Sequence, residues 1–287
     1  MTDETRAGFV AVIGAPNAGK STLVNALVGQ KVAIVSPKAQ TTRARLMGIA
    51  IEDRAQILLV DTPGIFEPRR RLDRAMIAAA WTGAQDADLV LLVIDAAAGV
   101  NVEIDRIISS LADRHHPLFI ALNKIDLVKK AELLAVSADI TAKLNPDKVF
   151  MISAAEGDGV PDLKQALADA MPLGPWLYPE DEVSDATDRM IAAELTREQI
   201  VNQLHQELPY ATAIETETWE DRPDGSTAIR QQILVERDSQ KAIGAAARAE
   251  ITEHLGRPVH LFLHVKVNPR WDEDRGLYRE MGLEWAD

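Results

Sequence analysis

The stretch 14-GAPNAGKS-21 indicates the fold of the first part of this chain. Two glycines with four residues between them are followed by Lys20 and Ser21, which is the P-loop pattern. A strand-like run, 9–13, precedes it and a helix-like run, 20–29, follows it, as the motif requires. Glycines let the backbone wrap a phosphate with its amides pointing inward. An incidental glycine-rich turn is the alternative, and the flanking strand and helix argue against it.

The P-loop assigns roles to its side chains. The Lys20 ammonium would neutralise the outer phosphates of a nucleotide, and the Ser21 hydroxyl would bind Mg²⁺. The predicted nucleotide-binding residues in this stretch are Gly14, Asn17, Ala18, Gly19, Lys20, Ser21 and Thr22.

The first half of the chain alternates strand-like and helix-like runs. The strand-like runs are 9–13, 54–60, 89–95, 118–122 and 148–152, and the helix-like runs are 20–29, 71–83, 101–114, 129–144 and 160–170. Most of the strand-like runs are continuously apolar, which suits strands covered on both faces. The alternation predicts an α/β fold with a mostly parallel sheet wrapped by helices.

Two further stretches add to the P-loop. In "LLVDTPGI", Asp61 ends an apolar strand, where its carboxylate can hold the metal through water, and the Gly64 amide can reach the terminal phosphate. A DTPG turn is weak alone, because Asp-Thr-Pro-Gly is also ordinary turn sequence. Its position after a P-loop gives it weight.

The second stretch, "ALNKID", follows another apolar strand and predicts guanine recognition. The Asp126 carboxylate can accept two neighbouring donors on the guanine edge, a pair that adenine lacks. Asn123 can brace the loop, and the stem of Lys124 can cover the ring. A polar strand-end loop is the alternative. Ser153 and Ala154, in "MISAAEG", can complete the base pocket.

The second half has a different organisation. Residues 1–171 are predicted as the P-loop domain, 172–184 as a proline-rich linker and 185–287 as a smaller domain with a tail. Beyond the linker come a helix, 188–207, two strands, 211–219 and 227–235, a helix and a strand, 258–267. The order α-β-β-α-β predicts a small α+β domain.

Composition sets limits on function. Cysteine is absent, which excludes disulfides and thiolate metal sites, and no signal peptide or membrane-spanning run is seen. The sequence therefore predicts a soluble, cytoplasmic protein. The net charge is −13, with −3 in residues 1–180 and −10 in residues 181–287. Any nucleic-acid binding must therefore rest on a local basic patch.

These motifs, with "KAQTTRARLMGI" (residues 38–49), "VERDSQ" (235–240) and "VHLFLHVKV" (259–267), resemble the Era family over nearly the whole chain. The resemblance implies a GTPase that uses GTP/GDP and Mg²⁺ and acts in small (30S) ribosomal subunit assembly. It also implies a C-terminal KH domain that binds the 3′ end of 16S rRNA. Thr41 or Thr42 would contact Mg²⁺ in a switch segment. Peripheral membrane association is implied by the family alone, and a monomer is the default.

The residue after Gly64 bears on the rate of hydrolysis. Ras-like GTPases place a water-positioning glutamine there, whereas this chain has Ile65. Catalysis would rest on Mg²⁺, Lys20, Thr42 and the Gly64 amide, which predicts slow intrinsic turnover. Relatives with an asparagine in the P-loop, matching Asn17, can use a bound potassium ion beside the phosphates, and the resemblance implies the same here as a hypothesis. An ATP-driven motor or kinase, which NKID argues against, and a nucleotide sensor with negligible turnover are the alternatives.

The expected RNA-gripping loop is missing. KH domains hold single-stranded RNA with a GxxG loop, yet Gln240 is followed directly by "KAIG", and residues 237–256 contain no GxxG. Three explanations are open: the sequence omits a segment, the deletion is deliberate, or RNA gripping is lost. The cations that could flank an RNA groove, or lie simply at the surface, are Lys241, Arg248, Lys266 and Arg270. A protein-interaction domain that no longer grips RNA is the alternative.

Overall fold

The computed structural model describes residues 4–35, 46–62, 64–65, 71–111, 115–203, 212–235, 244–267, 274–280 and 283. The chain divides into two compact units. The main body of the first unit reaches to Asp185, and that of the second begins at Ala186.

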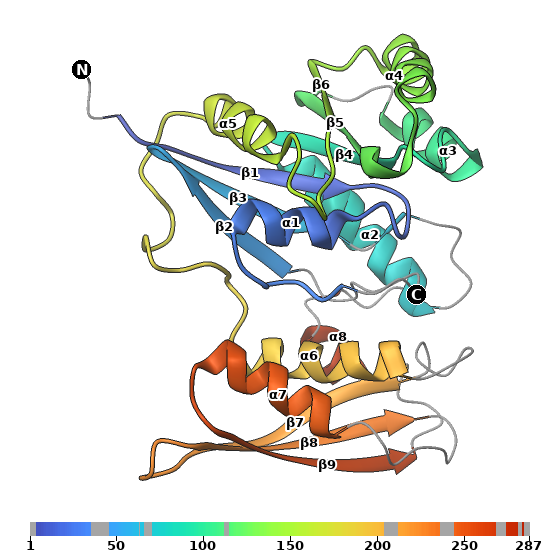
Figure 1. Ribbon diagram of the computed structural model, residues 1–287. Helices are drawn as coiled ribbons and strands as arrows, with labels where there is room; N and C mark the ends of the chain where they lie inside the picture. The colour runs from blue at the N-terminus through green and yellow to red at the C-terminus, as the bar shows by residue number, and fades with distance from the viewer. Residues whose placement is uncertain are drawn as a thin grey trace. The chain divides into compact units, whose positions relative to one another are not determined.

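The first unit is built on a six-stranded sheet (Figure 1). Its strands, in spatial order, are β2 (Leu46–Glu52), β3 (Ala55–Asp61), β1 (Arg6–Ile13), β4 (Leu89–Asp95), β5 (Leu118–Asn123) and β6 (Lys148–Met151). All neighbouring pairs are parallel except β2 with β3. The predicted α/β fold with a mostly parallel sheet is confirmed.

Helices cover both faces of this sheet. The helices of the first unit are α1 (Lys20–Val28), α2 (Arg71–Asp86), α3 (Val102–Leu111), the 3₁₀ turn η1 (Ile125–Leu127), α4 (Lys130–Leu144) and α5 (Val160–Ala170). One core contains apolar side chains of α1 and α5, such as Leu27 and Leu163, and the other contains those of α2, α3 and α4, such as Ile107. Because both faces are buried, β4 and β5 are apolar at every residue before the last, which is Asp95 in β4 and Asn123 in β5.

Strand β2 was not among the predicted strands. Its first four residues, 46–49, belong to the stretch "KAQTTRARLMGI", which was interpreted as part of a switch segment. The strand lies at the edge of the sheet and runs antiparallel to β3, in register from Leu46 opposite Asp61 to Glu52 opposite Ala55. A two-residue connection makes this hairpin, whereas the other pairs need helical crossovers.

The predicted linker, 172–184, is hydrogen-bonded to the first unit. Pro172 accepts a bond from the Ala7 amide, and Val183 accepts one from the Ile49 amide of β2. Between them, the buried Gln56 side chain accepts bonds from the amides of Leu177 and Tyr178 and donates to the Tyr178 carbonyl, at 2.8–3.0 Å. These residues extend the first unit along the β2 and β3 side of its sheet.

The second unit has a three-stranded sheet with helices on one face (Figure 1). Its elements are α6 (Asp188–Gln203), β7 (Thr212–Asp221), β8 (Thr227–Val235), α7 (Gly244–Leu255), β9 (Val259–Val267) and α8 (Arg275–Glu280). Strand β8 is central, antiparallel to β7 and parallel to β9. Leu195 of α6 and Ile251 of α7 are buried against Ile229 of β8. The predicted α-β-β-α-β order is therefore observed.

Within the described part of the chain, no helix has both the length and the apolar character needed to cross a membrane.

Candidate nucleotide-binding site

The candidate site lies where parallel strands of the first unit end. Strands β1, β3, β4 and β5 are neighbours, and their carboxyl ends meet at one edge of the sheet. This edge is where ligands bind in open α/β sheets. The P-loop follows β1, the DTPG turn follows β3 and the NKID stretch follows β5. The fold thus brings together three motifs that lie far apart in the sequence.

Two glycines of the P-loop have no room for a side chain. Gly14 has φ 153°, and a Cβ there would lie 2.3 Å from the Val93 carbonyl oxygen. Gly19 has φ 93°, and a Cβ there would lie 2.2 Å from the Asn123 Nδ2 atom. Residues other than glycine rarely adopt such backbone angles. Both glycines therefore let the loop approach β4 and the NKID stretch closely.

Lys20 is buried at the first residue of α1. Its Nζ atom donates to the carbonyl oxygens of Ala15, at 2.9 Å, and Gly14, at 3.2 Å. Burial lowers the pKa of Lys20 from 10.5 to about 8, and the Asp61 carboxylate acts in the opposite direction. The ammonium therefore lies inside the curve of the loop, where a phosphate would be held, and an added negative charge there would favour its protonated form.

The two residues predicted to hold the metal are in direct contact. The Ser21 hydroxyl donates to the Asp61 Oδ2 atom at 2.9 Å. Asp61 is fully buried at the end of β3. A hydroxyl and a carboxylate are the hard oxygen ligands that Mg²⁺ prefers, with water and substrate phosphates supplying the rest. The donor set of this chain therefore fits Mg²⁺.

The residues after Asp61 are held against the P-loop. The Thr62 hydroxyl donates to the Val12 carbonyl at 2.7 Å, and the Ile65 amide donates to the Gly14 carbonyl at 3.0 Å. A Cβ at Gly64 would lie 2.9 Å from the backbone of Pro16. The Ile65 side chain is buried in the core with the α2, α3 and α4 residues. It faces apolar side chains and has no group that could orient water.

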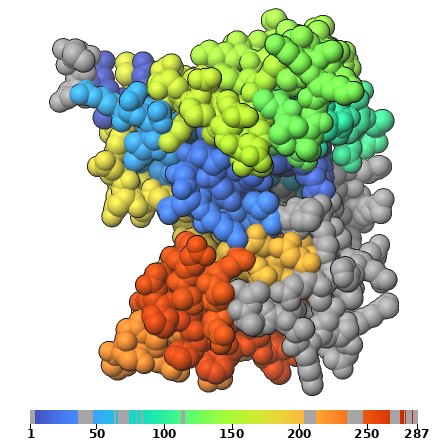
Figure 2. Space-filling view, in the orientation of Figure 1, coloured from blue at the N-terminus to red at the C-terminus, as the bar shows by residue number. Residues whose placement is uncertain are grey.

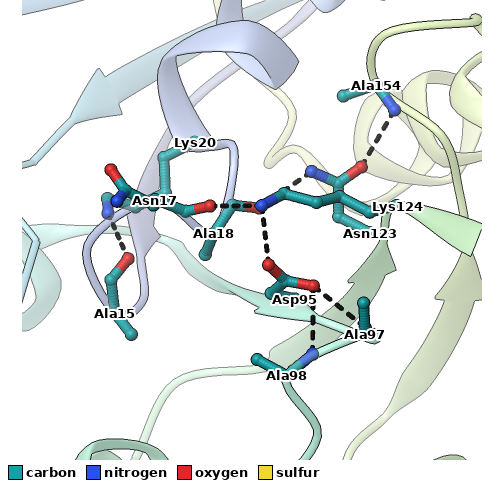
Figure 3. A network of polar contacts seen from close by, with 10 residues as sticks. All are labelled: Ala15, Asn17, Ala18, Lys20, Asp95, Ala97, Ala98, Asn123, Lys124 and Ala154. Atoms are coloured by element: carbon teal, nitrogen blue, oxygen red, sulfur yellow. Dashed lines mark hydrogen bonds and ion pairs between the residues drawn. The ribbon is translucent and has the colours of Figure 1, made fainter. Parts of the chain in front are cut away.

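Asn123 connects the phosphate-binding part of the site to the predicted base pocket (Figure 3). Its side chain is 2% exposed. Its Nδ2 atom donates to the Ala18 carbonyl at 2.8 Å, and its Oδ1 atom accepts the Ala154 amide at 2.9 Å. One carboxamide thereby fixes the P-loop and the segment after β6 in a single geometry, and the sequence predicted its bracing role.

Lys124 makes a second link to the P-loop, and its acidic partner was not predicted. Its Nζ atom donates to the Asn17 carbonyl at 2.7 Å and pairs with the Asp95 Oδ2 atom at 2.6 Å (Figure 3). Lys124 and Asn17 both have left-handed backbone angles, φ 66° and 61°. Asp95 ends an apolar strand next to the NKID strand, and that position was the available signal for its role.

The remaining residues of the predicted base pocket lie around this network. Ser153 is fully buried, and its hydroxyl accepts the Glu156 amide at 3.3 Å. Asp126 is exposed in the 3₁₀ turn η1. Thr22 lies in the first turn of α1. An exposed carboxylate beside the network is available to the edge of an incoming base.

Several predicted residues lie outside the described part of the chain. These are the switch threonines Thr41 and Thr42 and the candidate RNA-contacting residues Lys241 and Arg270. Of the other two candidate cations, Arg248 is exposed on α7 and Lys266 is exposed on β9. Helix α7 contributes to the surface of the second unit that Figure 2 shows in orange-red.

Comparison with known proteins identifies the family. A family model described as a 50S ribosome-binding GTPase matches residues 9–124. GTPase Era of Afipia carboxidovorans is 57% identical, with 98% of this chain and 95% of that protein covered. GTPase Era of Erythrobacter litoralis is 53% identical over the whole of both chains. The chain belongs to the Era family of GTPases. It therefore binds GTP and hydrolyses it to GDP and phosphate.

Solved Era structures agree over both units. A crystal structure of Era in complex with MgGDPNP and nucleotides 1506–1542 of 16S ribosomal RNA has a TM-score of 0.90 and 34% identity, covering 97% of this chain and 99% of that one. A structure of an Aquifex aeolicus Era variant bound to GDP·AlF₄⁻ has the same values. The alignment with the Erythrobacter Era spans 303 positions, 16 more than this chain has residues. That Era protein thus has residues with no counterpart here.

Proposed function

We propose that this Era-family chain is a GTP-dependent switch that acts in assembly of the small ribosomal subunit. The observation that carries the nucleotide part is the Asn123 side chain, whose two hydrogen bonds join the P-loop to the segment after β6. In a guanine nucleotide bound at this site, the phosphates would contact the P-loop amides and the base would contact Asp126.

The residues present divide the work of binding as follows. Lys20 and the backbone amides of the P-loop, apart from Pro16, which has no N–H, hold the phosphates, and the Gly64 amide contacts the terminal one. Ser21, Asp61 and the switch residues Thr41 and Thr42 would hold Mg²⁺, and the ion would supply positive charge against the phosphates. Asn123, Lys124, Asp126, Ser153 and Ala154 form the base pocket.

We infer slow intrinsic hydrolysis from Ile65, because it faces the apolar core and its amide is bonded to the Gly14 carbonyl. No side chain at that position orients water, so stabilisation of charge carries the reaction. A potassium ion bound next to Asn17 would add a positive charge there. Hydrolysis is then expected to be faster in potassium than in sodium buffer at equal ionic strength, and equal rates would remove potassium from the proposal.

The test of the base pocket is a change of specificity. The Asp126 carboxylate accepts two donors from guanine, whereas the carboxamide of an Asp126→Asn variant offers one acceptor and one donor, which matches xanthine. Fluorescent GDP is expected to bind the native protein, and fluorescent XDP the variant. A native protein that binds fluorescent ADP as well as GDP would overturn the assignment. Asp158→Asn, a change on the exposed turn after β6, is the control and should keep guanine specificity.

For the second unit we propose binding to the 3′ end of 16S rRNA, and the related Era crystallised with nucleotides 1506–1542 of 16S ribosomal RNA supports this. The support is the α-β-β-α-β order with helices on one face of the sheet. Exposed cations on α7 and β9, Arg248 and Lys266, can contact phosphates. The connection between β8 and α7 contains no GxxG, so gripping by such a loop is not proposed for this chain.

A 3′-end oligonucleotide of 16S rRNA, compared with a scrambled one of equal length, tests RNA binding by the full chain. Preferential binding that weakens as salt rises supports the proposal. Equal, weak binding of both RNAs favours the second candidate, a nucleotide-regulated domain that recruits a protein. That candidate rests on the missing loop and on the −10 charge of residues 181–287.

A further inference from the structure

Asp95 lies beside the nucleotide-binding site but belongs to none of its motifs. It is the last residue of β4 and lies opposite Asn123, the last residue of β5, in the parallel register. The Ala96 amide donates to the Asn123 carbonyl at 2.9 Å. The end of β4 is thus tied to the NKID stretch through the backbone as well as through side chains.

Both carboxylate oxygens of Asp95 are engaged. The Oδ1 atom accepts the amides of Ala97, at 2.9 Å, and Ala98, at 3.3 Å, which fixes the side chain on its own loop. The Oδ2 atom is then directed at the Lys124 ammonium, 2.6 Å away (Figure 3). The side chains of the pair are only 23% and 31% exposed. A partly buried charged pair with fixed geometry holds its members more firmly than a surface ion pair does.

Lys124, held by Asp95, in turn hydrogen-bonds the P-loop. Its ammonium donates to the Asn17 carbonyl, and Asn17 occupies a left-handed backbone conformation that costs energy for a residue other than glycine. The next carbonyl, that of Ala18, accepts a bond from Asn123. Two consecutive P-loop carbonyls are therefore held by two consecutive residues of the NKID stretch, and Asp95 holds one of these two.

We propose that Asp95 is a positioning residue for nucleotide binding, which acts through Lys124 to hold the P-loop at Asn17 and the lysine stem against the guanine. The inference rests on the proposed roles of Asn123 and Lys124. Asp95 itself does not contact the nucleotide. Its loss should weaken GDP and GTP alike, because the base pocket and Asn17 serve both.

The test is a double-mutant cycle on the full chain. Asp95→Asn keeps the size of the side chain and removes its charge. We expect fluorescent GDP to dissociate about tenfold faster and KM for GTP to rise about tenfold, with kcat at saturation changed less than about twofold. In a Lys124→Met background the same change should add less than about twofold, because the partner through which Asp95 acts is gone.

Two controls separate positioning from loss of fold. Asp147 accepts the Leu118 amide at 2.8 Å at the start of β5, the far end of the strand that carries Asn123, and Asp147→Asn should leave GDP dissociation unchanged. Asp95→Ser retains a short acceptor for the Ala97 and Ala98 amides and should reproduce the effect of Asp95→Asn. Thermal unfolding without nucleotide checks that each variant is folded.

The outcomes are distinct. An equal effect of Asp95→Asn in the native and Lys124→Met backgrounds, or no effect in the native one, overturns the inference while guanine binding stands. The same acceleration in Asp147→Asn overturns it too, because the effect would then be general. A native protein with no preference for GDP over ADP overturns the inference together with the proposed base pocket.

Discussion

At the scale of single residues, the site places a cation where water has little access. Lys20 is 6% exposed and donates to two carbonyls of the loop that it closes. Its depressed pKa, about 8, follows from desolvation and makes protonation sensitive to any anion placed nearby. A phosphate raises that pKa, so nucleotide binding and proton uptake are linked.

The linkage predicts how GDP affinity depends on pH. Below about pH 8, Lys20 is protonated in both the free and the bound protein, so its effect on affinity is constant. Above that pH the free protein loses the proton and binding must restore it, so affinity falls by up to about tenfold per pH unit. Fluorescent-GDP titrations from pH 7 to 9 measure the slope. In a Lys20→Met variant only the nucleotide titrates, so the fall in GDP affinity above pH 8 should be absent. Equal slopes of affinity against pH in the native protein and the variant would contradict the prediction.

Two glycines at the ends of α1 give a matched pair. Gly19 and Gly29 have similar φ values, 93° and 89°, but a Cβ at Gly19 would lie 2.2 Å from the Asn123 Nδ2 atom and one at Gly29 meets nothing within 4 Å. Gly19→Ala should weaken GDP binding by about 2–4 kcal/mol, because it adds loss of the Asn123 hydrogen bond to backbone strain.

Gly29→Ala carries the backbone strain alone. We expect it to lower the free energy of unfolding by about 1 kcal/mol and to leave GDP affinity within about twofold. Calorimetric GDP titration and urea unfolding of both variants check the pair. Equal losses of affinity would show that the left-handed backbone, and not the approach to Asn123, sets the requirement for glycine.

At the scale of elements, every strand of the two sheets was predicted except β2. β4 and β5 are apolar up to their last residues because helices cover both faces, and such runs are visible in one sequence. β2 was missed because its first residues continue a polar stretch and because an edge strand needs no continuous apolar run. Its antiparallel pairing with β3 can be seen only once the hairpin has folded.

The candidate site shows the same division. Gly14, Lys20 and Asn123 were predicted because P-loop and NKID chemistry fixes residue types at fixed spacings. Asp95 belongs to no such pattern, and its role depends on β4 lying next to β5, which only the fold establishes. The linker, 172–184, was predicted from its prolines and glycine, whereas its hydrogen bonds to Gln56 depend on a partner more than a hundred residues away.

At the scale of the whole molecule, the first unit includes residues 172–184, whose own composition is that of a linker. Gln56 is fully buried, and its side chain bonds the backbone of Leu177 and Tyr178. We expect Gln56→Leu to lower the free energy of unfolding of the first unit by about 2–4 kcal/mol, because it removes three part-buried hydrogen bonds to the backbone of Leu177 and Tyr178.

Urea unfolding, followed together with amide exchange at Leu177 and Tyr178, measures this effect. The control is Gln165→Leu, because Gln165 bonds an exposed Asp169 at 3.2 Å and should contribute less than about 0.5 kcal/mol. Equal stability of the Gln56 and Gln165 variants would mean that the segment does not belong to the cooperative first unit.

The hydrogen bonds of residues 172–184 also determine where the chain can be truncated to give an isolated first unit. Val183 and Ser184 cover the outer edge of β2 at Ile49 and Gly48. A fragment that stops at Met171 would expose this edge, and open strand edges pair with other chains. Self-association of that fragment would then be a product of the truncation, whereas a fragment that continues through Asp185 would retain its natural cover. A fragment of the first unit therefore has to include residues 172–185, fourteen residues with the composition of a linker, in order to stay monomeric in solution.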